Sequence, residues 1–184
     1  IANSLIRQTH GYWRHTTISL VVPAIKDDIS FLHELNTNIK YQLRKPDEII
    51  VILSGTSQKD CVKIEGWTIE CFDEKIHQGE ARNIGWDMAS SDIVSFMDAD
   101  DTMYPERIEI IHKMFNKNKN LKLLVHEFDR IKRSDFRLNS MRQHNINSNP
   151  DIDDGHMLYI TMKKTQGKQL HLRIDLAHGH VSIQ

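Results

Sequence analysis

The sequence alternates short apolar runs, rich in β-branched residues, with segments in which apolar residues recur every three or four positions. Runs of the first kind are typical of strands buried on both faces of a sheet, and segments of the second kind are typical of amphipathic helices. Strands are predicted at residues 16–22, 48–53, 67–72, 93–97 and 121–128. Helices are predicted from Asp28 to Lys45, over residues 79–88, and from Pro105 onward. This order predicts an α/β fold with a mostly parallel sheet and helices on both faces.

Some element ends are predicted from single residues. Pro23 is expected to stop the first strand, because proline lacks the N–H that a sheet ladder needs. Residues 156–162 and 169–174 are expected to form a small antiparallel edge near the C-terminus. Four apolar residues share one face of the first helix and are expected to be buried: Leu32, Leu35, Ile39 and Leu43.

Composition and charge exclude several classes of function. The 184 residues suit one domain, and 24 Lys and Arg nearly balance 25 Asp and Glu, so no net field draws the chain to nucleic acid. The longest apolar run, residues 18–25, is too short to span a membrane, and no signal-peptide pattern precedes it. Cys61 and Cys71 lack metal-site spacing and are expected to be reduced thiols, which favours a cytoplasmic location.

Three aspartates, Asp98, Asp100 and Asp101, follow the predicted strand at residues 93–97. Ligands of open α/β sheets bind outside the carboxyl ends of the strands, where these carboxylates would lie. In an extended chain residues two apart point the same way, so Asp98 and Asp100 are expected to converge on one cation while Asp101 points elsewhere. Hard oxygen ligands favour Mg²⁺ or Mn²⁺, with substrate phosphates completing the shell. The alternative is a solvated acidic turn.

Two further residues are candidates for the same site. Arg82 is predicted in the first turn of a helix, where free N–H groups favour an anion, so it could contact a phosphate or a nucleoside carbonyl. The alternative for Arg82 is a surface position in a solvated turn. His178 and His180 would share one face of a strand, and His180 could complete a metal shell, although such pairs are more often structural.

Four segments together resemble the nucleotide-binding half of family 2 glycosyltransferases, which have the Rossmann-like glycosyltransferase A fold. They are SLVVPAIKDD at residues 19–28, EIIVILSGTS at 48–57, GEARNIGWDMASSDIVSFMDADD at 79–101, and Tyr104-Pro105. The resemblance implies a single domain over residues 1–184. Within it, residues 16–128 would be the nucleotide-sugar-binding half, and residues 129–184 would be a partial, truncated acceptor-side region.

By this resemblance the chain would move a sugar from a nucleotide-diphosphate donor to an acceptor hydroxyl, usually with inversion at the anomeric carbon. The implied ligands are Mn²⁺ or Mg²⁺ and a nucleotide sugar, with a UDP sugar expected before a GDP sugar. The acceptor would be a glycan, a lipid or a protein. Asp98 and Asp100 would be the catalytic residues that hold the metal and the donor. The resemblance implies further donor contacts at Val22, Pro23, Ala24, Ser54, Arg82 and Ala99.

The chain also departs from the family pattern. Leu53 and Ser54 stand where the family usually has two acidic residues, so no carboxylate is present to accept from a uracil N–H. No motif identifies the general base, and the carboxylates that remain as candidates are Asp151, Asp153, Asp154 and Asp175. Two other functions stay open: a non-catalytic, nucleotide-binding relative, and a haloacid-dehalogenase-type phosphatase in which Asp98 attacks phosphorus and Asp100 is the acid/base.

Overall fold

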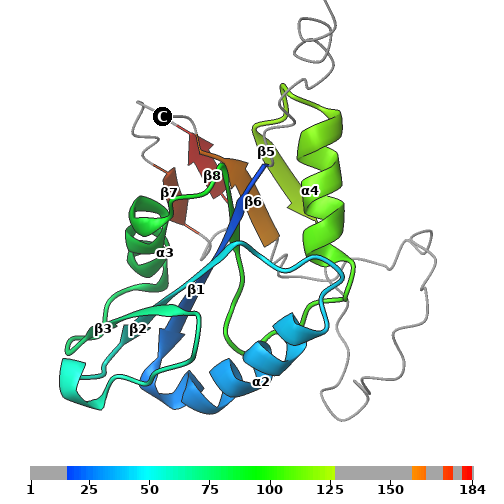
Figure 1. Cartoon of the computed structure of the whole chain (residues 1–184). Coiled ribbons are helices and arrows are strands. Elements are labelled where there is room, and N and C mark those ends of the chain that lie inside the picture. The colour runs from blue at the N-terminus through cyan, green and yellow to red at the C-terminus, as the bar shows by residue number, and fades with distance from the viewer. Residues whose placement is uncertain (1–15, 127–158, 165–171, 176–179, 184) are drawn as a thin grey trace, which may run out of the picture.

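The computed structural model describes residues 16–126, 159–164, 172–175 and 180–183 (Figure 1). The strands are β1 (Ile18–Ile25), β2 (Glu48–Ser54), β3 (Thr68–Phe72), β4 (Ile93–Phe96), β5 (Leu123–His126), β6 (Tyr159–Lys163), β7 (Leu172–Asp175) and β8 (His180–Ile183). The helices are η1 (Lys26–Asp28), α2 (Ile29–Lys40), η2 (Gln58–Asp60), α3 (Gln78–Met88) and α4 (Arg107–Lys117). The elements η1 and η2 are short 3-10 turns.

Strands β1 to β6 form one sheet in the order β3-β2-β1-β4-β6-β5. Neighbours among β1 to β4 are parallel, whereas β6 is antiparallel to both β4 and β5. Strands β7 and β8 form a separate antiparallel pair. The predicted mostly parallel sheet and the small antiparallel C-terminal extension are therefore both confirmed.

Helices cover both faces of the sheet, as predicted (Figure 1). Leu20 and Val22 of β1 pack in the apolar cluster that includes α2 and α4, whereas Val21 packs in the cluster that includes α3. Successive side chains of a strand point to opposite faces, so a strand covered on both sides is apolar throughout. The helical residues buried in the first cluster are Leu32, Leu35, Ile39, Ile108, Ile111 and Phe115.

The prediction that Pro23 stops the first strand is wrong, because β1 continues to Ile25. The last pair between β1 and β4 is Val21 with Phe96, so Pro23 lies beyond the end of β4 pairing. The carbonyl of Val21 faces β4 and accepts from the N–H of Met97. Pro23, two residues later, turns its nitrogen to that same side, where no ladder requires an N–H.

Two other boundary predictions also differ from the structure. Helix α2 ends at Lys40, and Leu43 is 67% exposed, because the chain leaves the helix and the Leu43 N–H donates to the carbonyl of Pro105. Strand β6 lies inside the sheet and not at its edge, because it pairs with β4 on one side and β5 on the other. Its residues Thr161 and Met162 are accordingly buried.

Cys61 and Cys71 form a disulfide, so the prediction of two reduced thiols is wrong. Cys71 lies in β3, and Cys61 follows η2 in the connection from β2. That connection folds back along β3, where the Thr56 N–H donates to the Phe72 carbonyl and the Gln58 side chain donates to the Cys71 carbonyl. The fold-back brings the two sulfurs together, which the spacing of the cysteines alone does not indicate.

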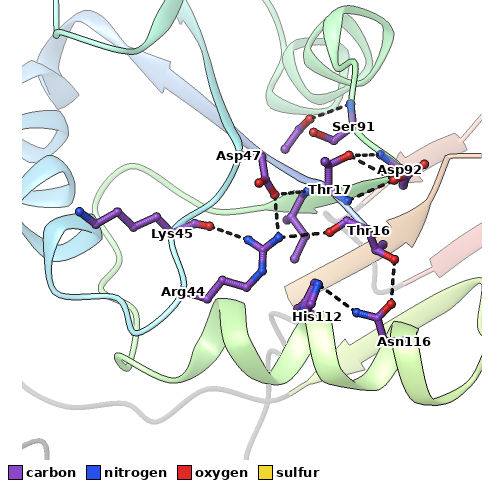
Figure 2. Close-up of polar contacts among 11 residues, drawn as sticks. Thr16, Thr17, Arg44, Lys45, Asp47, Ser91, Asp92, His112 and Asn116 are labelled. Atoms are coloured by element: carbon purple, nitrogen blue, oxygen red, sulfur yellow. Dashed lines mark hydrogen bonds and ion pairs between the residues drawn. The ribbon is translucent and has the colours of Figure 1, made fainter. Parts of the chain in front are cut away.

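Polar side chains join the amino ends of the central strands (Figure 2). Asp92, which precedes β4, accepts from the N–H and the hydroxyl of Thr17 at 3.1 and 3.2 Å. Asp47, which precedes β2, accepts from the N–H of Ile18 at 2.8 Å and from Arg44 at 2.9 Å. These contacts cross-link the amino ends of the strands, and the predicted site residues lie at the opposite, carboxyl ends.

Candidate functional site

The strand order reverses between β1 and β4. Strands β2 and β3 lie on one side of β1, and β4 lies on the other side and runs parallel to β1. In open α/β sheets, ligands bind at the carboxyl ends of the strands where the order reverses in this way. The end of β1 and the residues that follow β4 meet at this point.

The predicted donor contacts from β1 and β2 lie together at these carboxyl ends. The pairing of Ile25 with Ser54 places the ends of the two strands side by side. The side chains of Val22, Pro23 and Ala24 are buried, and Ser54 is 2% exposed. A ligand at this edge would therefore meet mainly the backbone and the half-exposed Ile25.

The aspartates after β4 lie in a turn and not in an extended strand. Residues Ala99 and Asp100 form its centre, and the N–H of Asp101 donates to the carbonyl of Asp98 at 3.3 Å. The extended geometry from which we expected Asp98 and Asp100 to converge is therefore wrong. Aspartates suit such a turn because their short polar side chains are favoured at turn positions. Asp100 is exposed, and Ala99 is buried beneath it at 3% exposure.

Arg82 holds the first aspartate of this turn. Its guanidinium Nη2 lies 2.6 Å from Asp98 Oδ1, and the two side chains are only 5% and 15% exposed. The side-chain amide of Gln78 donates to the same oxygen at 3.1 Å. Both donors come from the first turns of α3, so the helix orients the Asp98 carboxylate through Oδ1. Arg82 is thus a buried ion-pair partner and not a surface residue.

The far end of the turn is held by two buried amides that sequence reasoning missed. The side chain of Asn38 donates to the carbonyl of Met103 and accepts from its N–H, each at 3.0 Å. The side chain of Gln42 donates to the carbonyl of Tyr104 at 2.8 Å and accepts from the N–H of Ile108 at 3.4 Å. Their spacing could have indicated this role, because Asn38 and Gln42 lie four residues apart and each directly precedes a residue of the predicted apolar face, Ile39 and Leu43.

The sequence matches the family described as Glycosyl transferase family 2 over residues 19–179. The chain belongs to this family. The α/β fold expected for a member of this family is the fold observed. No curated protein matches the sequence.

Solved structures similar to this family 2 chain include residues 1–349 of TarS from S. aureus, at 16% identity and a TM-score of 0.46. That similarity covers 56% of this chain and 33% of the TarS chain. A mannosyltransferase from Pyrobaculum calidifontis, in complex with GDP-Man and Mn²⁺, is 18% identical with a TM-score of 0.48. It is matched over 58% of this chain and 34% of its own. The chain thus spans about a third of the length of these proteins.

The two residues predicted as metal ligands, Asp98 and Asp100, both lie in the turn after β4. Asp98 Oδ1 is engaged by α3, while its Oδ2 has no hydrogen bond among the described residues, and Asp100 is exposed two residues later. Two carboxylates suit Mg²⁺ or Mn²⁺ when phosphates complete the shell. No three His, Cys, Asp or Glu side chains gather as a metal site within the described ranges.

The other predicted residues lie at or beyond the limits of what the structure describes. His180 begins β8 and is paired with Asp175 of β7. The candidate bases Asp151, Asp153 and Asp154, and also His178, lie outside the described residues. A metal role for His180 and the identity of the general base therefore stay predictions.

Proposed function

We propose that the chain binds a nucleotide-diphosphate sugar at the carboxyl ends of β1 and β4 and transfers the sugar to an acceptor hydroxyl. One observation carries the proposal: in a chain of this family, an acidic turn with an exposed Asp100 follows β4 where the strand order reverses. Family membership favours the reaction class. The position of the turn favours its role in binding the diphosphate, because ligands of such sheets bind at this edge.

Asp98 and Asp100 are proposed as the residues that hold Mn²⁺ or Mg²⁺ against the diphosphate. Asp98 would use Oδ2, since Arg82 and Gln78 occupy Oδ1. When bound, the metal would neutralise charge that develops on the departing diphosphate. His180 remains a proposed additional ligand.

The proposed reaction is an inverting displacement at the anomeric carbon. The acceptor oxygen forms a bond to that carbon as the bond to the diphosphate oxygen breaks, and the acceptor proton passes to a carboxylate. The candidates for that base are Asp151, Asp153, Asp154 and Asp175. The diphosphate leaves with the bonding electron pair.

The donor is proposed to be a UDP sugar, with a GDP sugar as the second candidate. Leu53 is fully buried and apolar, so it offers nothing to a base N–H. Ser54, at the end of β2, remains a proposed donor contact through its backbone, because its side chain is buried. Val22, Pro23 and Ala24 would border the base, and Ala99 would lie against the donor.

A second candidate is a non-catalytic relative that binds the nucleotide alone. It is favoured by the engagement of Arg82 with Asp98, which commits two predicted ligand contacts to each other. The phosphatase alternative is weakened by the family match and by the same ion pair, which holds the proposed nucleophile Asp98. Turnover of a nucleotide sugar in the presence of acceptor would separate the first two functions.

Location and acceptor also remain proposals. Helices within the described ranges lack the length and apolar character needed to cross a membrane. A cytoplasmic location is the original expectation, but the Cys61–Cys71 disulfide argues for a more oxidising compartment, because cytosolic thiols are kept reduced. Thiol labelling of the protein in its native host would decide between them. The acceptor is proposed to be a glycan, a lipid or a protein, without a nucleic-acid partner.

Calorimetric titration of UDP and GDP, each with Mn²⁺, Mg²⁺ or chelator, tests the proposed function. We expect metal-dependent binding of one nucleotide to the wild type, and a loss of at least about tenfold in affinity in Asp100→Ala, because a metal ligand is removed. Asp87→Ala is the matched control, since Asp87 is an exposed aspartate at the other end of α3. Equal binding by Asp100→Ala and the wild type would refute the assignment of the site, and no binding of either nucleotide would refute the donor class.

A further inference from the structure

Residues 98–105 form an arch that is anchored at both ends and exposed in the middle. Asp98 is held by α3, and Ala99 and Met103 are buried at 3% and 1% exposure in the same apolar cluster. Asp100 and Thr102 are exposed between these two buried residues. The direction of the Asp100 side chain therefore depends on where the backbone is fixed on either side of it.

The downstream anchor is a side-chain amide that makes the two backbone hydrogen bonds a neighbouring strand would otherwise make. Met103 lies in neither a helix nor a strand, yet its backbone is buried, so its N–H and carbonyl need partners. The amide of Asn38 supplies both, with Nδ2 donating to the carbonyl and Oδ1 accepting from the N–H, each at 3.0 Å. Asn38 is itself 5% exposed and 65 residues away in the chain. An amide carries one donor group and one acceptor, so it can satisfy both backbone groups at once.

Neighbouring contacts extend the same anchor. Gln42 binds the carbonyl of Tyr104, and the N–H of Leu43 donates to the carbonyl of Pro105 at 2.9 Å. Helix α2 and the residues after it thus hold three consecutive backbone carbonyls of the segment that follows the acidic turn. Of the three residues held in this way, Met103, the partner of Asn38, is the closest in sequence to Asp100 and lies three residues beyond it.

We infer that Asn38 is a positioning residue for ligand binding: by fixing Met103, it sets the direction in which Asp100 presents its carboxylate to the metal and diphosphate. This inference rests on the proposed function of the acidic turn. It gives α2, which packs on one face of the sheet, control over the direction of a carboxylate that Asn38 does not itself contact.

The first test compares Asn38→Ala with Thr37→Ala. Thr37 is the exposed neighbour of Asn38, and within the described part of the chain its hydroxyl makes one local hydrogen bond, to the carbonyl of His33. Well below the melting temperature of each variant, we expect Asn38→Ala to weaken metal-dependent nucleotide binding by about tenfold, the lower end of the effect of outer-shell residues on metal affinity. Nucleotide binding measured with chelator should change little, and Thr37→Ala should match the wild type in both.

Asn38→Asp adds a readout that a role in stability alone would not move. Burial disfavours the charged form of the introduced carboxyl and raises its pKa. At low pH the neutral acid can donate to the Met103 carbonyl and accept from its N–H, as the amide does, whereas at high pH the carboxylate repels that carbonyl. Metal-dependent affinity of Asn38→Asp, relative to Asn38→Ala at each pH, should therefore rise as pH falls from about 8 to 5.5.

A double-mutant cycle with Asp100→Ala tests whether Asn38 acts through that carboxylate. In the Asp100→Ala background, Asn38→Ala should cause no further loss of metal-dependent binding. If the wild type binds with metal but Asn38→Ala in its folded state binds equally well, the inference is refuted and the proposed function stands. If the wild type shows no metal-dependent binding, the proposed function fails first. If Asn38→Ala weakens metal-dependent binding as much in the Asp100→Ala background as in the wild type, the inference is also overturned.

Discussion

Gly85→Ala is predicted to destabilise the protein by forcing α3 away from β1. A Cβ built at Gly85 would lie 2.3 Å from Val21 Cγ1, and 3.4 Å from both Val21 Cβ and Cγ2. Carbon atoms prefer separations of about 3.5–4.0 Å, so the helix or the strand must shift by more than about 1 Å. Val21 is fully buried at the last pair between β1 and β4, where a shift has little room.

The magnitude follows from two opposing effects. Overpacking a buried contact costs about 1–3 kcal/mol, while alanine contributes up to about 1 kcal/mol relative to glycine inside a helix. The 2.3 Å approach places the overpacking cost in the upper part of its range, about 2–3 kcal/mol, so the net loss should be about 1–2 kcal/mol in the free energy of unfolding. For a domain of this size that corresponds to a fall in Tm of roughly 2–8 °C.

Differential scanning calorimetry of four variants measures this effect. Asn83→Ala is the control, because Asn83 is exposed on the same helix and its replacement should change the unfolding free energy by less than about 0.5 kcal/mol. Val21→Ala removes the methyl groups that clash, so Gly85→Ala should cost less in that background than in the wild type. A Gly85→Ala protein as stable as the wild type, or effects that simply add in the double variant, would refute the close-packing argument.

Two further predictions concern the Arg82–Asp98 ion pair and the Cys61–Cys71 disulfide. Arg82→Ala should lower the free energy of unfolding, measured in urea, by about 1–3 kcal/mol, because it removes a charged hydrogen bond from the partly buried Asp98. Arg82→Lys should have a stability between those of Arg82→Ala and the wild type. Unchanged stability in Arg82→Ala would contradict a structural role for the ion pair. Replacing Cys61 and Cys71 together by serine should cost about 2–3 kcal/mol, since the disulfide closes a short loop with a sequence separation of 10. Reductant should lower the Tm of the wild type but not that of the serine variant. A wild-type Tm that does not change with reductant would contradict the presence of the disulfide.

Strand and helix identities were accessible from the sequence where the apolar pattern was strong. The helix predicted from Pro105 onward is α4, and β4 was predicted to within one residue. The pattern failed where a tertiary partner decided the outcome. Pro23 continues β1 because β4 ends before it, and Leu43 is exposed because its backbone pairs with Pro105.

The candidate site divides in a similar way. The acidic residues and Arg82 were identified from their positions after a buried strand and at the start of a helix. Their contacts were not, because each contact joins segments far apart in the chain: Arg82 reaches Asp98 across 16 residues, and Asn38 reaches Met103 across 65. The turn at residues 98–101 replaced the expected extended geometry for the same reason, since both of its ends are fixed from other elements.

The sequence by itself determined the strand and helix order, the family, and the chemical character of the site, because periodicity and local motifs are properties of short segments. Only the tertiary structure decided which side chains satisfy one another. It paired Arg82 with Asp98, used Asn38 to hold Met103, joined Cys61 to Cys71, and placed β6 inside the sheet. Apart from the disulfide, these outcomes depend on burial, because a polar group removed from water must find a partner wherever the fold brings one.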